Sequence, residues 1–229
     1  MQFRKISFLI LIPIILVSCN TSSGQPQVNN EKNSPDTLTK NKNATSQDSF
    51  PQKIGLLPFD GIDSNYAHLA VKELEVFYNC TVEILPNKPL PRNAYYQPRN
   101  RYKADSLINW LAGIYPGKYD RIVGITDKDI STTKDTYDDW GIMGLGFCPG
   151  RSCVISTFRL KKNADQEKIN VRFVKVVLHE TGHTFGLPHC NSGDTTCLME
   201  DAAGTIKSVD REQKRLCKSC CSKIQPYLR

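Results

Sequence analysis

The sequence lacks the features that mark several large classes of protein. Its longest apolar run, residues 6–17, has twelve residues, whereas a membrane-spanning helix needs roughly 20. It has no long basic run, and a formal net charge of +7 over 229 residues is a mild excess, so nucleic acid is not an expected partner. No internal repeat is visible, and the length fits one domain with a tail. Histidine is scarce as well, with only four in the chain.

The N-terminus has the pattern of a targeting segment. Arg4 and Lys5 precede the apolar run, which ends in LVSC at residues 16–19. This stretch resembles the lipobox of bacterial lipoproteins, and the resemblance implies cleavage before Cys19 and lipidation of that residue. A plain secretory signal and an uncleaved anchor are the alternatives. We expect a lipoprotein signal peptide over residues 1–18 and an exported protein held in the cell envelope by its lipid anchor. Asn20 is not the aspartate that some bacteria use for inner-membrane retention, which weakly favours the outer membrane.

The next segment, residues 19–50, is rich in Asn, Ser, Thr, Gln and Lys and has almost no large apolar residues. Such a composition cannot offset the entropy lost on ordering the chain, so a flexible tether is expected. The folded part is then a single domain over residues 51–229.

Apolar periodicity in the folded part alternates between strands and helices. Strands are expected over residues 53–59, 81–85 and 121–126, and helices from Asp63 or Ser64 to residue 78 and over residues 104–115. This order predicts an α/β fold with a mixed, mostly parallel twisted sheet backed by helices. Residues 141–147 and 153–160 form a hairpin, or two strands, around the turn CPGRSC. Residues 86–97 are taken as a proline-rich loop.

A last helix is expected from residue 163 or 164 to Thr184, although its sequence VRFVKVVL is rich in β-branched residues. Its apolar side chains fall on two stripes at helical spacing, as in a helix that is buried on most sides. The histidines that follow also fit only a helix.

Three of the four histidines lie within the twelve residues HETGHTFGLPHC, which start at His179. On a helix, His179 and His183 project from the same face and can share one ion, with Glu180 beside them. Gly186 permits a sharp turn after the helix, and His189 can then return beneath the metal. Three imidazoles leave the fourth tetrahedral position of Zn²⁺ open, which is the pattern of a catalytic site.

In such a site zinc lowers the pKa of a water molecule and polarises a peptide carbonyl, while Glu180 takes and returns the proton as general base. A bare H-E-x-x-H also arises by chance on unrelated helices, but the added glycine and third histidine make chance a poor explanation. The remaining histidine, His68, is expected to be a packed or surface residue.

The stretch resembles the metzincin zinc proteases, and Met199 is placed for the methionine turn of that superfamily. Cysteines then follow at Cys190, Cys197, Cys217 and Cys220, a series that resembles the archaemetzincin family. Two further stretches, PRNAYYQPRNRYKADSLINWL and DRIVGITDKDI, are also similar to family segments, so the likeness covers most of residues 53–220. It implies a zincin-like α+β fold with an active-site helix and a small C-terminal subdomain.

The resemblance implies that the four cysteines bind a second, structural zinc, giving two zinc ions per chain. Six residues separate Cys190 from Cys197 where the family has four, and a loop two residues longer is tolerated in closing such a site. Cys221 could replace Cys220, but the C-x-x-C spacing favours Cys220. Four nearby basic residues either offset the thiolate charge or form a solvated surface: Lys214, Arg215, Lys218 and Lys223.

The resulting prediction is a monomeric, membrane-tethered zinc metallopeptidase that acts on a peptide or protein substrate. A zinc-dependent peptide-binding protein of the same fold is the alternative. The family likeness also implies that the peptide pairs with an edge strand before the active-site helix, here within residues 154–158. Cys148 and Cys153 form a disulfide or remain free, and Cys80 is expected to be a buried apolar residue.

Overall fold

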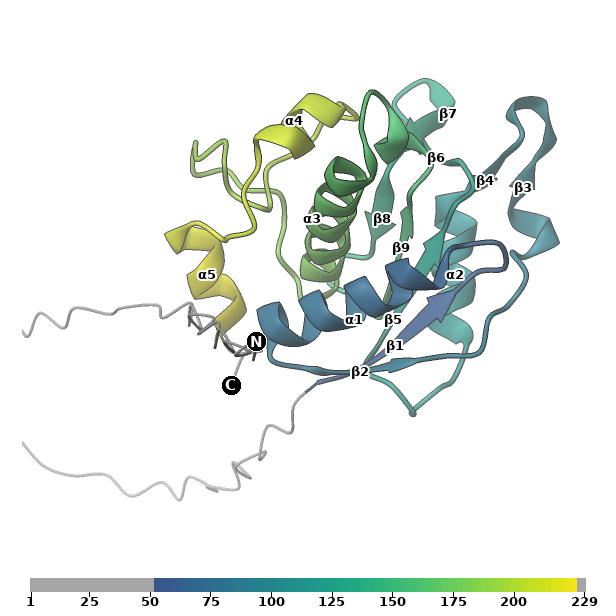
Figure 1. Ribbon diagram of the computed structural model, residues 1–229, viewed down its shortest axis with the longest axis horizontal. Coiled ribbons are helices and arrows are strands. Elements are labelled where there is room, and N and C mark those ends of the chain that lie inside the picture. Colours follow the sequence, from purple (N-terminus) through teal and green to yellow (C-terminus); the bar gives the residue numbers. More distant parts are fainter. Residues whose placement is uncertain (1–51, 226–229) are drawn as a thin grey trace, which may run out of the picture. The chain divides into compact units, whose positions relative to one another are not determined.

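The computed structural model describes residues 52–225 (Figure 1). The predicted signal peptide, lipidated Cys19 and tether therefore lie outside the described residues. Within residues 52–225, no helix combines the length and apolar character needed to cross a membrane.

A five-stranded sheet forms the centre of the fold and confirms the predicted mixed, mostly parallel architecture. The strand order is β2-β1-β5-β9-β8, and only the β8–β9 pair is antiparallel. Nearly all residues of β1, β5 and β9 are buried, as expected for parallel strands covered on both faces. The strands are β1 (Lys53–Pro58), β2 (Thr81–Ile84), β5 (Arg121–Thr126), β8 (Gly144–Gly146) and β9 (Ser152–Ser156).

Helices cover both faces of this sheet (Figure 1). Alternate residues of each central strand pack on opposite sides, with Val123 in the core under α1 (Ser64–Tyr78) and α3 (Gln166–Thr184). Ile122 packs in the second core, under α2 (Ala104–Gly113). The predicted α/β layering is therefore correct, and Asp63 caps α1 by accepting a hydrogen bond from the Asn65 backbone N–H at 2.9 Å.

A second sheet, of order β3-β4-β6-β7, was not predicted. Its strands are short and largely polar, so they carry little of the alternation that marks a strand. β3 lies in the expected proline-rich loop, and the end of β7 overlaps the expected strand over residues 141–147, which is in fact divided between β7 and β8. The bounds are β3 (Tyr95–Tyr96), β4 (Arg101–Lys103), β6 (Ile130–Lys134) and β7 (Tyr137–Ile142). Short 3₁₀ helices are η1 (Arg92–Ala94), η2 (Gln97–Arg99) and η3 (Arg159–Lys161).

Helix α3 forms despite its β-branched sequence because it is buried on nearly every side. From Arg172 to Thr184 every residue is buried, so packing outweighs the weak local preference for a strand. Asp165 accepts a hydrogen bond from the Lys168 backbone N–H at 2.8 Å and caps the helix, which begins at Gln166, two or three residues after the predicted start.

The C-terminal segment contains α4 (Ile206–Arg211) and α5 (Lys218–Ile224), two short helices that were not predicted. Its apolar residues join the core formed by α1 and α3. Two ion pairs add to this attachment: Arg172 of α3 with Asp210 at 2.7 Å, and Lys214 with Glu73 of α1 at 2.6 Å. The segment is thus held directly against the helix that carries the histidines.

Candidate active site and metal centres

One face of α3 lines a large cleft. Val176, His179, Glu180 and His183 recur at spacings of three and four, so they project from the same side of the helix. The cleft has a volume of about 550 Å³ and is also bordered by β6, β7, β8 and the loops that follow α3 and Met199.

The three histidines converge at this cleft. One ring nitrogen from each lies within 4.8 Å of the others, and the ring centroids are 4.7–5.4 Å apart. His179 and His183 are buried on α3, whereas His189 is exposed and reaches the site from the loop. That loop turns at Gly186, whose φ of +88° favours glycine, as the sequence predicted. His68 is exposed on α1 and takes no part.

Backbone carbonyls orient the two helical imidazoles. His179 Nδ1 lies 2.7 Å from the Leu198 carbonyl oxygen, and His183 Nδ1 lies 2.7 Å from that of Leu187. A carbonyl can only accept, so each Nδ1 carries the proton and each Nε2 keeps its lone pair. Burial, followed by the neighbouring His183, lowers the pKa of His179 to about 3, and burial also lowers the pKa of His183. Both rings are therefore neutral at pH 7, the form that binds a metal.

Glu180 is buried at the same cleft. Burial, with a smaller contribution from Glu212, raises its pKa to about 8. Its side chain lies against β8, because a Cβ atom built on Gly144 would lie only 2.5 Å from Glu180 Cγ. A Cβ on Gly146 would lie 2.7 Å from the Glu180 carbonyl oxygen. The two glycines thus allow α3 to approach the strand closely enough to set the carboxyl group beside it.

The sheet edge next to the site is β8, which corrects the prediction that it lies within residues 154–158. β9 is an interior strand, between β5 and β8. Ser156 N–H donates to the Met143 carbonyl, and Phe147 N–H donates to the Ser152 carbonyl, so alternate residues of β8 bond to β9. The backbone groups of Gly144 and Gly146 therefore point away from β9, toward the open edge.

Met199 lies beneath the histidine pair, where the sequence predicted a methionine turn. It is fully buried, and its Sδ would be 2.8 Å from a Cβ atom on Gly182, which directly precedes His183 on α3. Its carbonyl accepts a hydrogen bond from the Cys190 N–H at 2.6 Å. Met199 thereby links the floor of the histidine site to the cysteine cluster.

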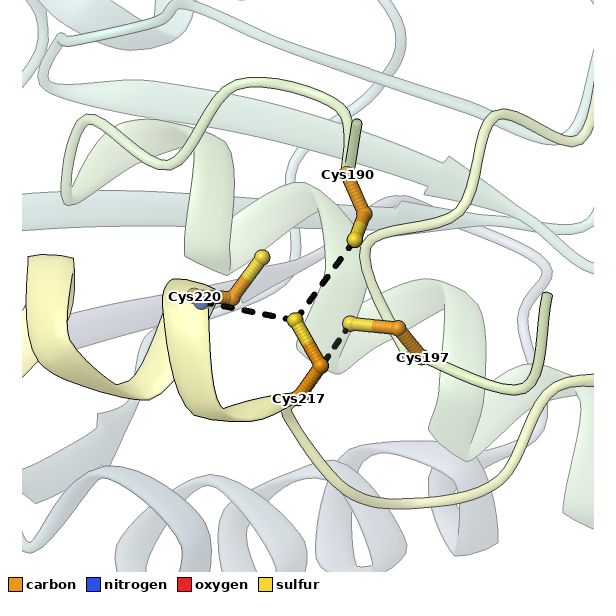
Figure 2. Close-up of side chains that lie close together, drawn as sticks. All are labelled: Cys190, Cys197, Cys217 and Cys220. Carbon is orange, nitrogen blue, oxygen red and sulfur yellow. Dashed lines mark hydrogen bonds between the residues drawn. The ribbon is translucent and has the colours of Figure 1, made fainter. Parts of the chain in front are cut away.

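The four predicted cysteines also come together, and their side chains point toward one another (Figure 2). Their sulfur atoms all lie within 4.8 Å of one another, and the Sγ atoms of Cys190 and Cys217 are 3.6 Å apart. Cys217 caps α5 and Cys220 lies in its first turn, so Cys220, and not Cys221, completes the cluster. Burial raises the pKa of the Cys217 thiol, but hydrogen bonds led by that from the Ser192 hydroxyl together lower it to about 6.

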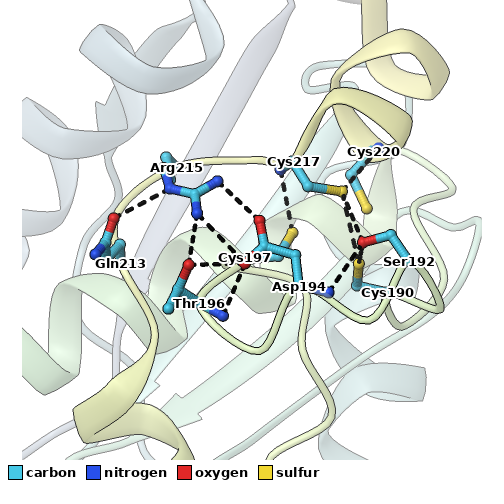
Figure 3. Close-up of polar contacts among 9 residues, drawn as sticks. All are labelled: Cys190, Ser192, Asp194, Thr196, Cys197, Gln213, Arg215, Cys217 and Cys220. Atoms are coloured by element: carbon cyan, nitrogen blue, oxygen red, sulfur yellow. Dashed lines mark hydrogen bonds and ion pairs between the residues drawn. The ribbon is translucent and has the colours of Figure 1, made fainter.

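The six-residue loop between Cys190 and Cys197 is secured from the side by Arg215 (Figure 3). Its guanidinium pairs with Asp194 at 3.0 Å and also donates to Thr196 and Gln213. Lys214, as noted, pairs with Glu73. Two of the four basic residues that were considered for offsetting thiolate charge are therefore engaged by carboxylates instead.

Both groups have the chemistry of zinc sites. Three convergent imidazoles at an open cleft fit an ion with one free coordination position, and four clustered thiols fit a closed tetrahedral site. The remaining cysteines are separate: Cys148 and Cys153 are free thiols, not a disulfide, and Cys80 is buried as expected. Sequence reasoning missed Glu212, which also lines the cleft, because a single glutamate after a short helix carries no motif.

Comparison with known proteins gives consistent matches. The sequence profile described as peptidase family M54 matches residues 60–226. An archaemetzincin from Natronomonas pharaonis is 31% identical over 179 residues, covering 75% of this chain and 98% of the relative. One from Methanopyrus kandleri is 36% identical over 140 residues, covering 61% of this chain and 75% of the relative.

Solved structures agree. The crystal structure of the Methanopyrus kandleri archaemetzincin superimposes with a TM-score of 0.67 at 32% identity, covering 80% of this chain and 98% of that one. The archaemetzincin from Archaeoglobus fulgidus, complexed with malonate, gives 0.64 at 29% identity and covers 75% of this chain and 99% of that one.

Proposed function

Because the chain belongs to peptidase family M54, the archaemetzincins, and is a zinc metallopeptidase, we propose that it hydrolyses peptide bonds with Glu180 as the general base. The observation that carries this proposal is the buried carboxyl group of Glu180 beside three convergent imidazoles in one cleft.

His179, His183 and His189 would hold the catalytic zinc, and the four clustered cysteines would hold a second, structural zinc. When bound at the imidazoles, zinc supplies the Lewis acidity needed to activate water and a peptide carbonyl near neutral pH. The Leu198 and Leu187 carbonyls keep the two helical rings in the tautomer that leaves Nε2 available.

Glu180 would move protons. Without a cation nearby, burial keeps this carboxyl group largely protonated at neutral pH, because its pKa is raised to about 8. A divalent cation at the neighbouring imidazoles favours the ionised form, which is the form that accepts a proton from water. The carboxylic acid so formed can then deliver that proton to the leaving amine nitrogen.

The peptide would lie along β8. The outward backbone N–H and C=O groups of Gly144 and Gly146 can pair with an extended chain, as in strand addition at a sheet edge. Since Gly144 also contacts Glu180, a peptide paired there passes close to the proton-transferring group.

The direct test is cleavage of a peptide library by the zinc-loaded full chain and by its Glu180→Ala variant. We expect cleavage by the unaltered chain and a loss of about 10²–10⁴-fold in the variant, the range for removal of a general base. Metal analysis of both proteins should give two zinc ions per chain. Cleavage that survives the substitution undiminished would refute Glu180 as the base.

We also propose that the mature chain is anchored to a membrane of the cell envelope through lipidated Cys19. The support is in the sequence alone: two basic residues, a short apolar run and the terminal LVSC. Mass spectrometry of the protein from a membrane fraction should find an N-terminal, lipid-modified Cys19, and Cys19→Ser should release the protein from that fraction. An unmodified Cys19 would exclude the anchor.

A further inference from the structure

The cleft contains a second buried carboxyl group, which the proposed proton transfer does not use. Glu212, which directly follows α4, is 4% exposed, and its Oε1 atom has no hydrogen-bond partner among the described residues. A buried polar atom without a partner is costly, and natural folds seldom keep one without a use. Glu212 borders the same cleft as Glu180, so a ligand in that cleft can supply the missing partner.

The charged neighbours of Glu212 do not satisfy it. Lys175 donates to the backbone carbonyl of Val209 at 2.9 Å, and Arg211 lies 3.9 Å from Glu200. Neither cation lies within 4.0 Å of the Glu212 carboxylate in residues 52–225, although Lys175 is close enough to oppose the upward shift of its pKa. Among the residues that line the cleft, three are acidic (Glu180, Asp201 and Glu212), and Lys134 is the one lysine or arginine.

Part of the lining of this cleft is apolar. Met143, Val176 and Val209 line the cleft and are 8%, 5% and 2% exposed. Val209 lies three residues before Glu212, and Val176 lies one helical turn before Glu180 on α3. Apolar walls with an acidic group fit a side chain that has an aliphatic stem and a cationic end.

We infer that Met143, Val176, Val209 and Glu212 form a subsite for a lysine or arginine side chain of the peptide substrate. This assignment rests on the proposed peptidase function. Because Val176 and Glu180 are successive positions on the cleft face of α3, the basic residue would occupy a position next to the bond that is cleaved. Burial raises the pKa of Glu212 to about 7, and a bound cation would stabilise its ionised form.

Position-resolved cleavage of N-acetylated peptide libraries by the zinc-loaded full chain tests the subsite. We expect lysine or arginine to be enriched at one position beside the cleaved bond. Glu212→Gln should reduce cleavage of lysine peptides relative to norleucine peptides by about tenfold to a hundredfold, as for loss of a charge-assisted hydrogen bond. Glu200→Gln is the matched control, because it removes a nearby carboxylate that does not line the cleft, and it should keep the preference.

A binding measurement separates this subsite from the catalytic proposal. Fluorescence anisotropy with the zinc-loaded Glu180→Ala variant would compare labelled peptide pools that carry lysine or norleucine at the same position. The lysine pool should bind more tightly, and adding Glu212→Gln should remove the difference. Glu212→Leu, which replaces the buried acid by an apolar residue, should fold stably and shift the preference to apolar side chains.

Three results would overturn the subsite. One is cleavage without any basic preference, which would leave the peptidase function intact. Another is equal binding of the lysine and norleucine pools, which decides the matter even if no peptide is cleaved. The third is a preference for peptides with a free N-terminus over the same peptides with an acetylated one. That result would mean that Glu212 binds the terminal ammonium group.

Discussion

The two candidate metal centres differ in how the chain brings their donors together. In the histidine centre, two donors lie one helical turn apart on α3. The third donor, His189, lies in the loop that directly follows this helix. In the cysteine centre, the donors come from a six-residue loop and from the start of α5, up to 30 residues apart in sequence. The histidine centre faces a cleft, whereas three of the four cysteines are buried.

This difference separates geometry that the protein can hold by itself from geometry that needs a metal. Buried helix packing and two backbone carbonyls orient the imidazoles of His179 and His183. The cysteine loops are held by a few ion pairs, such as Arg215 with Asp194, and by contacts among the thiols. We therefore expect the cysteine centre to contribute to folding and the histidine centre to catalysis.

Removal of one thiol should have the largest effect on stability. Cys220→Ala should release one of two zinc ions and destabilise the C-terminal segment by several kcal/mol, since the binding of structural zinc contributes to folding on the order of 10 kcal/mol. Thermal unfolding and metal analysis would measure this. A variant that keeps its melting temperature would show that the cluster is dispensable.

His189→Ala should have the opposite effect to Cys220→Ala, with a large loss of activity and a small change in stability. His189 is exposed, so its loss should change the free energy of unfolding of the metal-depleted protein by less than about 1 kcal/mol. Peptidase activity should nevertheless fall by roughly 10²–10⁴-fold, and one zinc ion should be lost. Comparing zinc content, activity and urea unfolding with the Cys220→Ala protein would sharpen the contrast between the two centres. Activity unchanged in His189→Ala would exclude it as a ligand.

Gly144→Ala should affect the active site through packing. Its new Cβ would lie 2.5 Å from Glu180 Cγ, so the carboxyl group or β8 must shift, at a cost of about 1–3 kcal/mol. The fractional loss of peptidase activity should exceed the fractional loss of bound zinc. Gly113→Ala is the control, because Gly113 is helical and a Cβ there meets no atom within 4 Å. Equal activity of the two variants would mean that the close approach of α3 to β8 is unimportant.

The last effect concerns pH and leaves both metal centres unaltered. Burial raises the pKa of Glu212 from its ordinary 4.5 to about 7, so the folded protein binds a proton that the unfolded chain releases between these values. Stability should therefore decline as pH rises from about 4.5 to 7, by roughly 3 kcal/mol or less from this group. Urea unfolding across this range should show a flatter profile for Glu212→Gln than for the unaltered chain. Parallel profiles would mean that folding does not raise the pKa of Glu212.

Much of the site could be predicted because its signals are local. The i, i+4 histidines and the C-x-x-C pair each define a geometry within one or two turns. The second sheet was missed because strands such as Tyr95–Tyr96 are too short to show a period. Glu212 was missed because its burial depends on α3 and α4 packing together, which leaves no mark in the neighbouring residues.

The order of residues alone specifies the donors and their chemistry: three imidazoles, one carboxylate and four thiols at spacings that suit a metal. The tertiary structure decided which strand is the open edge, which ring nitrogen faces the cleft and which acid lies buried beside Glu180. The two differ in how far along the chain their causes act, because helical spacing and turn chemistry depend on only a few neighbouring residues. Burial and strand order instead arise from contacts between segments that are far apart in the chain.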